Sequence, residues 1–81
     1  MFWQAADHNT TGLYVDKGGE RYELGFVQQF LFVYMCYLVH KDGSNTSLGG
    51  LADMASAKSH VEWNVRNLAP ETAGLHVGHT P

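Results

Sequence analysis

Apolar and polar positions alternate most regularly over residues 20–27, where Tyr22, Leu24 and Phe26 are separated by Arg21, Glu23 and Gly25. A period of two places alternate side chains on one side of a β-strand. The residues before it, 16–19, read Asp-Lys-Gly-Gly, and adjacent glycines accept the positive φ angles of a tight hairpin turn. We therefore predict a hairpin that joins a short strand at residues 13–15 to a longer strand at residues 20–27.

The second pattern is an uninterrupted apolar run over residues 30–39. A helix would gather part of this run on one side, but it would leave Phe32, Val33 and Cys36 facing outward, and no capping residue precedes it. Aromatic and β-branched residues favour a strand. We therefore predict a single strand with apolar side chains on both faces, which is typical of a strand covered on both sides.

A helix is predicted from residue 54 to residue 68, because Asp53 can cap its start and Pro70 stops it. At 100° per residue the apolar side chains that share one arc, and so form the predicted core face, are Met54, Ala57, Val61, Val65 and Leu68. Lys58 lies at the edge of this arc, where an ion pair with Glu62 one turn later is expected.

The remaining segments complete an α+β fold. Residues 1–6 suit an edge strand, residues 7–12 a loop, residues 41–45 a turn and residues 46–51 a short returning strand. We predict an antiparallel sheet of three to five strands with one C-terminal helix packed on one face. Residues 1–70 form the single domain that 81 residues allow, and residues 71–81 form a flexible C-terminal tail.

Composition narrows the functional classes. The chain has a net charge of −3, and its five Lys and Arg residues are scattered, so a nucleic-acid-binding stripe is not expected. The longest apolar run falls well short of the roughly 20 residues that span a membrane, so no membrane partner is expected. A lone cysteine, Cys36, and the lack of a recognisable signal sequence favour the cytoplasm.

No pattern of catalytic, cofactor-binding or metal-binding residues is evident. The pair His76 and His79 lacks a third ligand nearby, and the glycine-containing loop over residues 42–50 lacks the lysine of a phosphate-binding loop. We expect no cofactor, no metal and no enzymatic activity; a small enzyme or metal-binding protein is the least favoured class.

Surplus apolar surface points to a binding function instead. One helix covers one sheet face, which leaves apolar side chains such as Phe32 and Tyr34 for another polypeptide. Trp63 projects away from the predicted core face above small neighbours, and tryptophan is prominent in interfaces. The predicted partner-binding residues are Trp63, Ser59, Ser56, Phe32 and Tyr34.

The order of short strands, the Ser-Leu-Gly-Gly-Leu loop at residues 47–51 and a helix carrying Ala57-Lys58 and Val61-Glu62 also resembles small proteins of phages and mobile elements. Several anti-CRISPR inhibitors are similar in size and in the lack of a catalytic motif. The resemblance covers residues 12–68 in architecture alone. It implies a non-enzymatic inhibitor that masks a surface of a host protein complex; the alternative is a structural homo-oligomer, such as a homodimer, that buries its own apolar sheet face.

Overall fold

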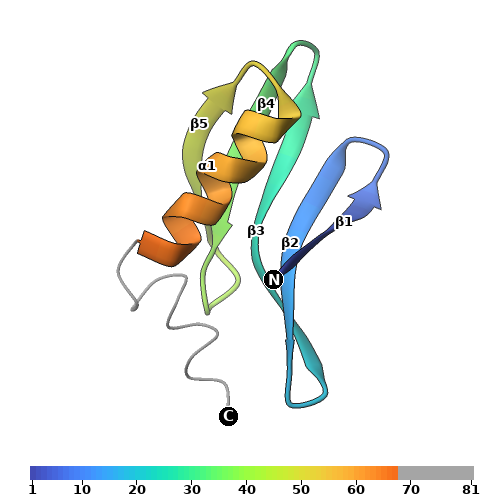
Figure 1. Ribbon diagram of the computed structural model, residues 1–81, viewed down its shortest axis with the longest axis vertical. Helices are drawn as coiled ribbons and strands as arrows, with labels where there is room; N and C mark the ends of the chain where they lie inside the picture. Colours follow the sequence, from blue (N-terminus) through green and yellow to red (C-terminus); the bar gives the residue numbers. More distant parts are fainter. Residues whose placement is uncertain (68–81) are drawn as a thin grey trace.

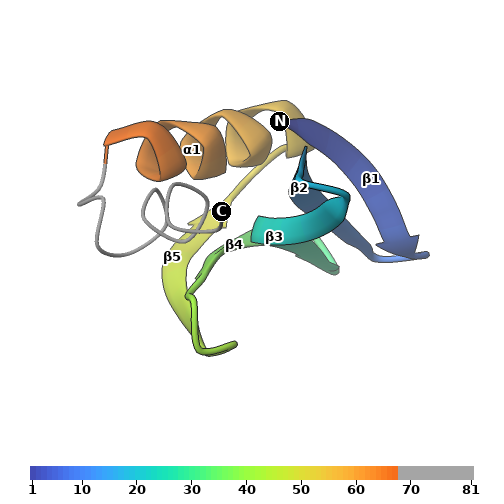
Figure 2. The ribbon, with the colours of Figure 1, turned by 90° about the horizontal axis from the view of Figure 1, so that it is seen from below.

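An antiparallel sheet with a helix across one face makes up the fold. The computed structural model describes residues 1–67, and its elements are β1 (Phe2–Asp7), β2 (Thr10–Lys17), β3 (Glu20–Phe30), β4 (Val33–Val39), β5 (Asn45–Leu51) and α1 (Met54–Asn67). The five strands lie in the order of the chain, each antiparallel to the next, and α1 covers one side of the sheet (Figure 1, Figure 2). The predicted α+β fold is confirmed.

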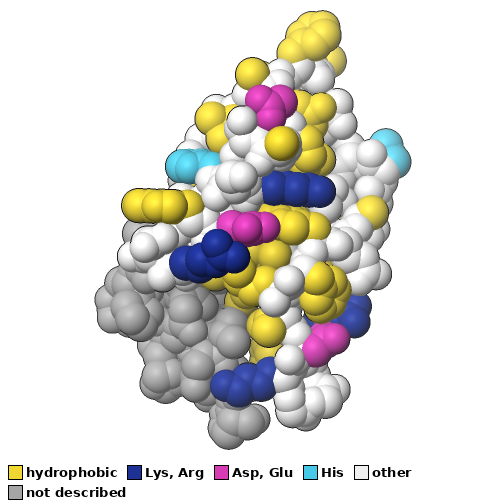
Figure 3. Space-filling view, viewed as in Figure 1, with side chains coloured by type: hydrophobic (Ala, Val, Ile, Leu, Met, Phe, Trp, Pro, Cys, Tyr) yellow, Lys and Arg dark blue, Asp and Glu magenta, His cyan; other side chains and the backbone are white. Residues whose placement is uncertain are grey.

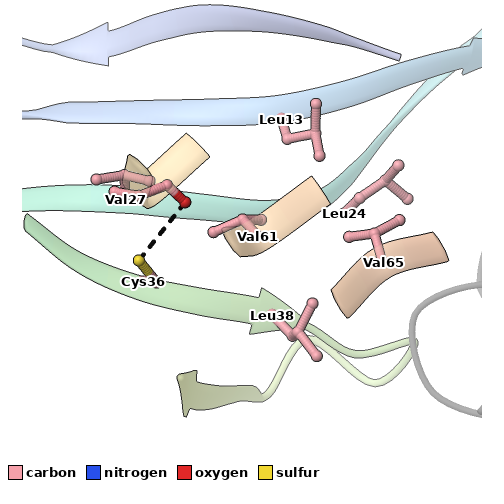
Figure 4. Packing of buried hydrophobic residues seen from close by; sticks show 8 residues of the cluster. Leu13, Leu24, Val27, Cys36, Leu38, Val61 and Val65 are labelled. Carbon is pink, nitrogen blue, oxygen red and sulfur yellow. Dashed lines mark hydrogen bonds between the residues drawn. The ribbon is translucent and has the colours of Figure 1, made fainter. Parts of the chain in front are cut away.

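The hydrophobic core lies between α1 and the middle of the sheet (Figure 4). Its buried residues come from three strands and the helix, and they are Leu13, Leu24, Val27, Cys36, Leu38, Ala57, Val61 and Val65. Three members of the predicted helix face are therefore buried as expected. Met54 is partly buried against the same cluster, and Leu68 lies outside the described residues.

The helix begins where the sequence predicted. The Asp53 carboxylate accepts hydrogen bonds from the backbone N–H and the hydroxyl of Ser56, at 2.8 and 3.1 Å, which caps the first turn. One polar residue also faces the core: the side-chain amide of Asn64 donates to the carbonyl of His60 at 2.8 Å, which satisfies a donor in a buried position.

The prediction of one strand over residues 30–39 is wrong. The run folds into a hairpin: β3 continues to Phe30, residues Leu31 and Phe32 form the turn, and β4 begins at Val33, which pairs with Phe30. The strand predicted at 20–27 accordingly extends through Gln28 and Gln29. No glycine, asparagine or proline marks this turn, so the apolar pattern continued through it without a visible break.

The regular alternation predicted for residues 20–27 is also broken. A β-bulge lies where Leu13 pairs with Gly25 and Tyr14 pairs with Glu23, which leaves Leu24 as the additional residue. Leu24 is therefore in the core with its neighbour Gly25, whereas Phe26 lies on the other side of the sheet.

Within residues 1–67, no helix or strand covers the second side of the sheet, which we call the open face. Alternation in β4 places Val33, Met35 and Tyr37 on this face. The rings of Phe26 and Tyr37 stack there at a centroid distance of 4.6 Å. Apolar side chains thus occupy both sides of β4, as predicted, but the strand is shorter than expected.

The first two strands form a tight hairpin instead of a strand and a long loop. β2 begins at Thr10, so residues 7–12 are not the predicted loop, and the turn contains His8 and Asn9. The Asp7 carboxylate accepts a hydrogen bond from the backbone N–H of Asn9 at 3.0 Å, which fixes this turn. The predicted strand at 46–51 is confirmed as β5, one residue longer.

The edge strand β1 is attached to the helix through Trp3. Its indole N–H donates to the Glu62 carboxylate at 2.6 Å, and the Lys58 ammonium lies 5.6 Å from the centre of the indole ring. The predicted ion pair between Lys58 and Glu62 is therefore replaced, because Glu62 faces Trp3 and lies 3.7 Å from Arg66. The helix therefore packs against the central strands of the sheet and is also hydrogen-bonded to β1.

Candidate protein-binding surface

Four consecutive apolar residues are exposed where β3 turns into β4. The exposed fractions of Phe30, Leu31, Phe32 and Val33 are 54%, 86%, 89% and 41%, and we call these four residues the hairpin tip. At roughly 200 Å² for each ring side chain, the two phenylalanines alone present about 300 Å² of apolar surface. That area already reaches the range of the largest apolar patch on a typical monomer, about 300–600 Å².

The backbone of the hairpin tip is strained. Leu31 has a φ angle of 51°, in the left-handed region that favours glycine and asparagine. A leucine in this conformation costs roughly 1 kcal/mol. Phe32 does not share this positive φ, and a glycine at the first turn position followed by a polar residue would form such a two-residue turn without this cost and without an exposed apolar surface. A turn that is both strained and apolar makes these four side chains candidates for a binding surface.

The base of the hairpin tip is held on both sides. On one side the carbonyl of Asn9, in the β1–β2 turn, accepts a hydrogen bond from the backbone N–H of Gln29 at 2.8 Å. On the other side Tyr34 pairs with Leu51 at the end of β5, and both pack against the core. The apolar side chains therefore project from a base that is held on both sides, and such preorganisation would limit the entropy lost in a binding event.

Two of the predicted partner-binding residues belong to this region. Phe32 is the most exposed residue of the hairpin tip, as expected of a contact residue. Tyr34 is half-buried on the helix side of β4, so it supports the base of the hairpin tip and presents less surface than predicted. Sequence reasoning missed Phe30, Leu31 and Val33, because it placed them within a continuous strand.

The other three predicted residues lie together elsewhere. Ser56, Ser59 and Trp63 share one side of α1, all are exposed, and 60% of the Trp63 surface is accessible. Ser56 is used in the helix cap. Trp63 follows the start of the helix by nine residues, roughly 14 Å along its axis. The predicted residues thus form two groups, the hairpin tip and the side of the helix.

Removing the Trp63 ring should leave the fold intact, because most of that ring is in solvent. We expect Trp63→Ala to lower the free energy of unfolding by less than about 1 kcal/mol in urea denaturation. Val61→Ala is the control on the same helix, and it should cost about 2 kcal/mol because Val61 is fully buried. A loss above about 3 kcal/mol for Trp63→Ala would mean that the ring is part of the core.

The buried thiol is not arranged as a nucleophile. Burial raises the pKa of the Cys36 thiol, and its Sγ lies 3.7 Å from the carbonyl oxygens of Tyr34 and Ala57. Burial also raises the pKa of the Glu23 carboxyl on the open face. Within residues 1–67 no three His, Cys, Asp or Glu side chains are grouped to hold a metal ion, and His76 and His79 lie outside the described residues.

Two surface hollows lie at the end of the sheet opposite the hairpin tip, and most of the residues that line them are charged or polar. One is lined by His40, Lys41, Asp42 and Ser44, and the other by Asp16, Gly19, Glu20 and Arg21. In each hollow one pair of lining side chains interacts directly. Asp42 accepts hydrogen bonds from Ser44, and Arg21 forms an ion pair with Asp16 at 2.9 Å.

The hairpin tip is thus the most apolar exposed feature of the part of the chain that the structure describes. None of the helices in that part has the length and apolar character needed to cross a membrane. Comparison with protein families, with curated proteins and with solved structures finds no match to this chain. The functional argument therefore rests on the surface itself.

Proposed function

We propose that this chain is a small non-enzymatic domain that binds another protein through the hairpin tip. The observation that supports this proposal best is the exposure of four consecutive apolar residues on a strained turn. Phenylalanine is among the residues enriched in protein interfaces, where a few well-packed side chains supply most of the binding energy.

A partner other than a second copy of the chain fits this surface better. A projecting apolar tip needs a concave apolar site, and the two hollows described above are lined by charged and polar residues. The edge of β5 is also unsuited to strand pairing between copies. A β-bulge at Leu48 interrupts this edge. The Leu48 carbonyl oxygen lies 3.2 Å from the His60 ring, and the Gly49 N–H donates to Ser47 at 3.3 Å, so these backbone groups already have partners within the chain.

Inhibition of a host protein complex in the cytoplasm is the form of binding that we favour. A rigid tip that fills an apolar pocket would exclude the natural occupant of that pocket, without any chemical step. The resemblance to anti-CRISPR inhibitors in size and architecture supports this role, and the lone buried Cys36 suits a reducing compartment.

The proposal is tested by replacing the two turn residues, Leu31 and Phe32, while leaving the strands of the hairpin unchanged. The double variant Leu31→Gly, Phe32→Asn places glycine at the turn residue of positive φ and a polar residue after it, so its stability should lie within about 1 kcal/mol of the parent. Binding should weaken by about 2 kcal/mol or more, because two anchor side chains are lost. Thermal denaturation measures the first effect, and calorimetric titration with the partner recovered by crosslinking measures the second.

Trp63→Ala is the matched control for this experiment, because it removes an exposed aromatic ring from the other predicted group. It should bind like the parent if the hairpin tip is the interface. If the turn variant binds as tightly as the parent while Trp63→Ala does not, the side of α1 is the interface and the proposal fails.

A further inference from the structure

Charge is distributed unevenly between the two ends of the sheet. The antiparallel order places the β2–β3 and β4–β5 turns at the end far from the hairpin tip, and these regions contain Lys17, Arg21 and Lys41. The other two basic residues, Lys58 and Arg66, lie along α1. None of the five Lys and Arg residues is therefore at the end that carries the hairpin tip.

Two carboxylates stand on either side of the hairpin tip. Asp7 ends β1, and it lies in the same row of the sheet as Gln28, two strands away and thus at about 10 Å. Asp53 follows Leu51, the residue that pairs with Tyr34 at the base of the hairpin tip. Both aspartates are exposed. Figure 3 shows an acidic side chain close to the hydrophobic side chains at the projecting end of the molecule, with Lys and Arg farther down.

Local hydrogen bonds fix the position of both carboxylates. Asp7 accepts from the N–H of Asn9, and this bond is the main reason that the pKa of its carboxyl lies below the ordinary value. Asp53 accepts from Ser56 in the helix cap. Each carboxylate therefore occupies a defined place at the end of the sheet that carries the hairpin tip, and protein interfaces commonly carry a polar rim around an apolar centre.

We propose that the hairpin tip docks into an apolar pocket of a partner protein whose rim carries Lys or Arg side chains opposite Asp7 and Asp53. This inference rests on the proposed function and adds the chemistry of the partner. Complementary charges at a rim mainly speed association and select the partner, while the apolar centre supplies affinity.

The same arrangement of charges argues against two other binding partners for the hairpin tip, an anionic membrane and a second copy of the chain. An anionic membrane attracts Lys and Arg side chains, and among its described residues this end of the molecule has neither, only His8 in the β1–β2 turn. Two tips meeting about a two-fold axis would bring four carboxylates together. The two hollows of a second copy are lined mainly by charged and polar residues, whereas the tip carries only apolar side chains.

The experiment places the photocrosslinking amino acid p-benzoylphenylalanine at position 32 of the full chain and irradiates it in an extract of the source organism's host. The crosslinked peptide is identified by mass spectrometry, and the protein containing it is purified for kinetic measurements at pH 8. We expect an apolar pocket with Lys or Arg nearby in that protein. Raising the salt from 50 to 500 mM should slow association about ten-fold, since exposed charges are then screened.

Variants that neutralise Asp7 and Asp53 distinguish the contribution of these two carboxylates from that of the apolar hairpin tip. Asp7→Asn with Asp53→Asn keeps a side-chain acceptor for the turn and the cap, and should slow association about five-fold. The matched control, Glu20→Gln with Asp42→Asn, changes the net charge equally at the far end of the sheet and should leave association within two-fold of the parent.

The outcomes distinguish this inference from the proposed function. If the Gly-Asn turn variant loses binding but neither the Asp7→Asn, Asp53→Asn variant nor salt changes the association rate, the proposal of a basic rim on the partner is wrong and the hairpin tip remains the interface. If position 32 crosslinks only to a second copy or to lipid, or to nothing, the inference and the proposed function both fall.

Discussion

Gly25→Ala is expected to lower the free energy of unfolding by about 3 kcal/mol, at the upper end of what overpacking a core costs. A methyl group at this position would lie 2.6 Å from the carbonyl oxygen of Tyr37 and 2.7 Å from a methyl carbon of Val61. Neither neighbour can move freely, since one is backbone within the sheet and the other is a fully buried side chain. The helix would have to shift away from β3. Urea denaturation followed by circular dichroism measures the loss.

Gly12→Ala is the control, because its methyl group would meet the ring of Tyr14 at 2.5 Å from the hydroxyl oxygen. That ring is only half-buried and can turn aside, so the cost should be below about 1 kcal/mol. Equal losses for the two variants would show that the close contact of α1 with β3 is not what Gly25 provides.

Leu24→Ala should destabilise the protein by about 3 kcal/mol, in the middle of the range for buried leucine truncations. Leu24 is the additional residue of the β3 bulge and only 1% of its surface is exposed. A domain of this size has roughly 5 to 10 kcal/mol of total stability, so the midpoint of urea denaturation should fall markedly.

The same substitution in the hairpin tip is the control. Leu31→Ala removes the same atoms from a side chain that is 86% exposed, so it should change stability by less than about 0.5 kcal/mol. If the two variants are equally stable, Leu24 is not packed as the structure describes.

The helix could be predicted because its signals are local. Asp53 at the cap and the spacing of Ala57, Val61 and Val65 each depend on residues within a few turns, and all four act in the structure as predicted. The antiparallel sheet was predicted for a similar reason, since the Gly18-Gly19 turn marks its second hairpin. Both glycines have positive φ angles, 63° and 83°.

The candidate site could not be located from the same kind of signal. A run of ten residues is long for a strand, which typically has five or six, but nothing within it marked the turn. Leu31 adopts a conformation that its side chain disfavours, and such a departure from local preference is seen only once the pairing of Phe30 with Val33 is known. The partial exposure of Tyr34 likewise depends on Leu51, a residue far along the chain.

The order of the strands has a consequence for how the chain folds. Every strand pairs with its neighbour in sequence, so the sheet can grow by successive closure of short loops, which lose little entropy. The bond from Trp3 to Glu62 is different, because it joins residues 59 positions apart. A polypeptide with mostly local contacts folds rapidly. Here the attachment of the first strand to the helix must bring together the two ends of the described part of the chain, residues 1–67.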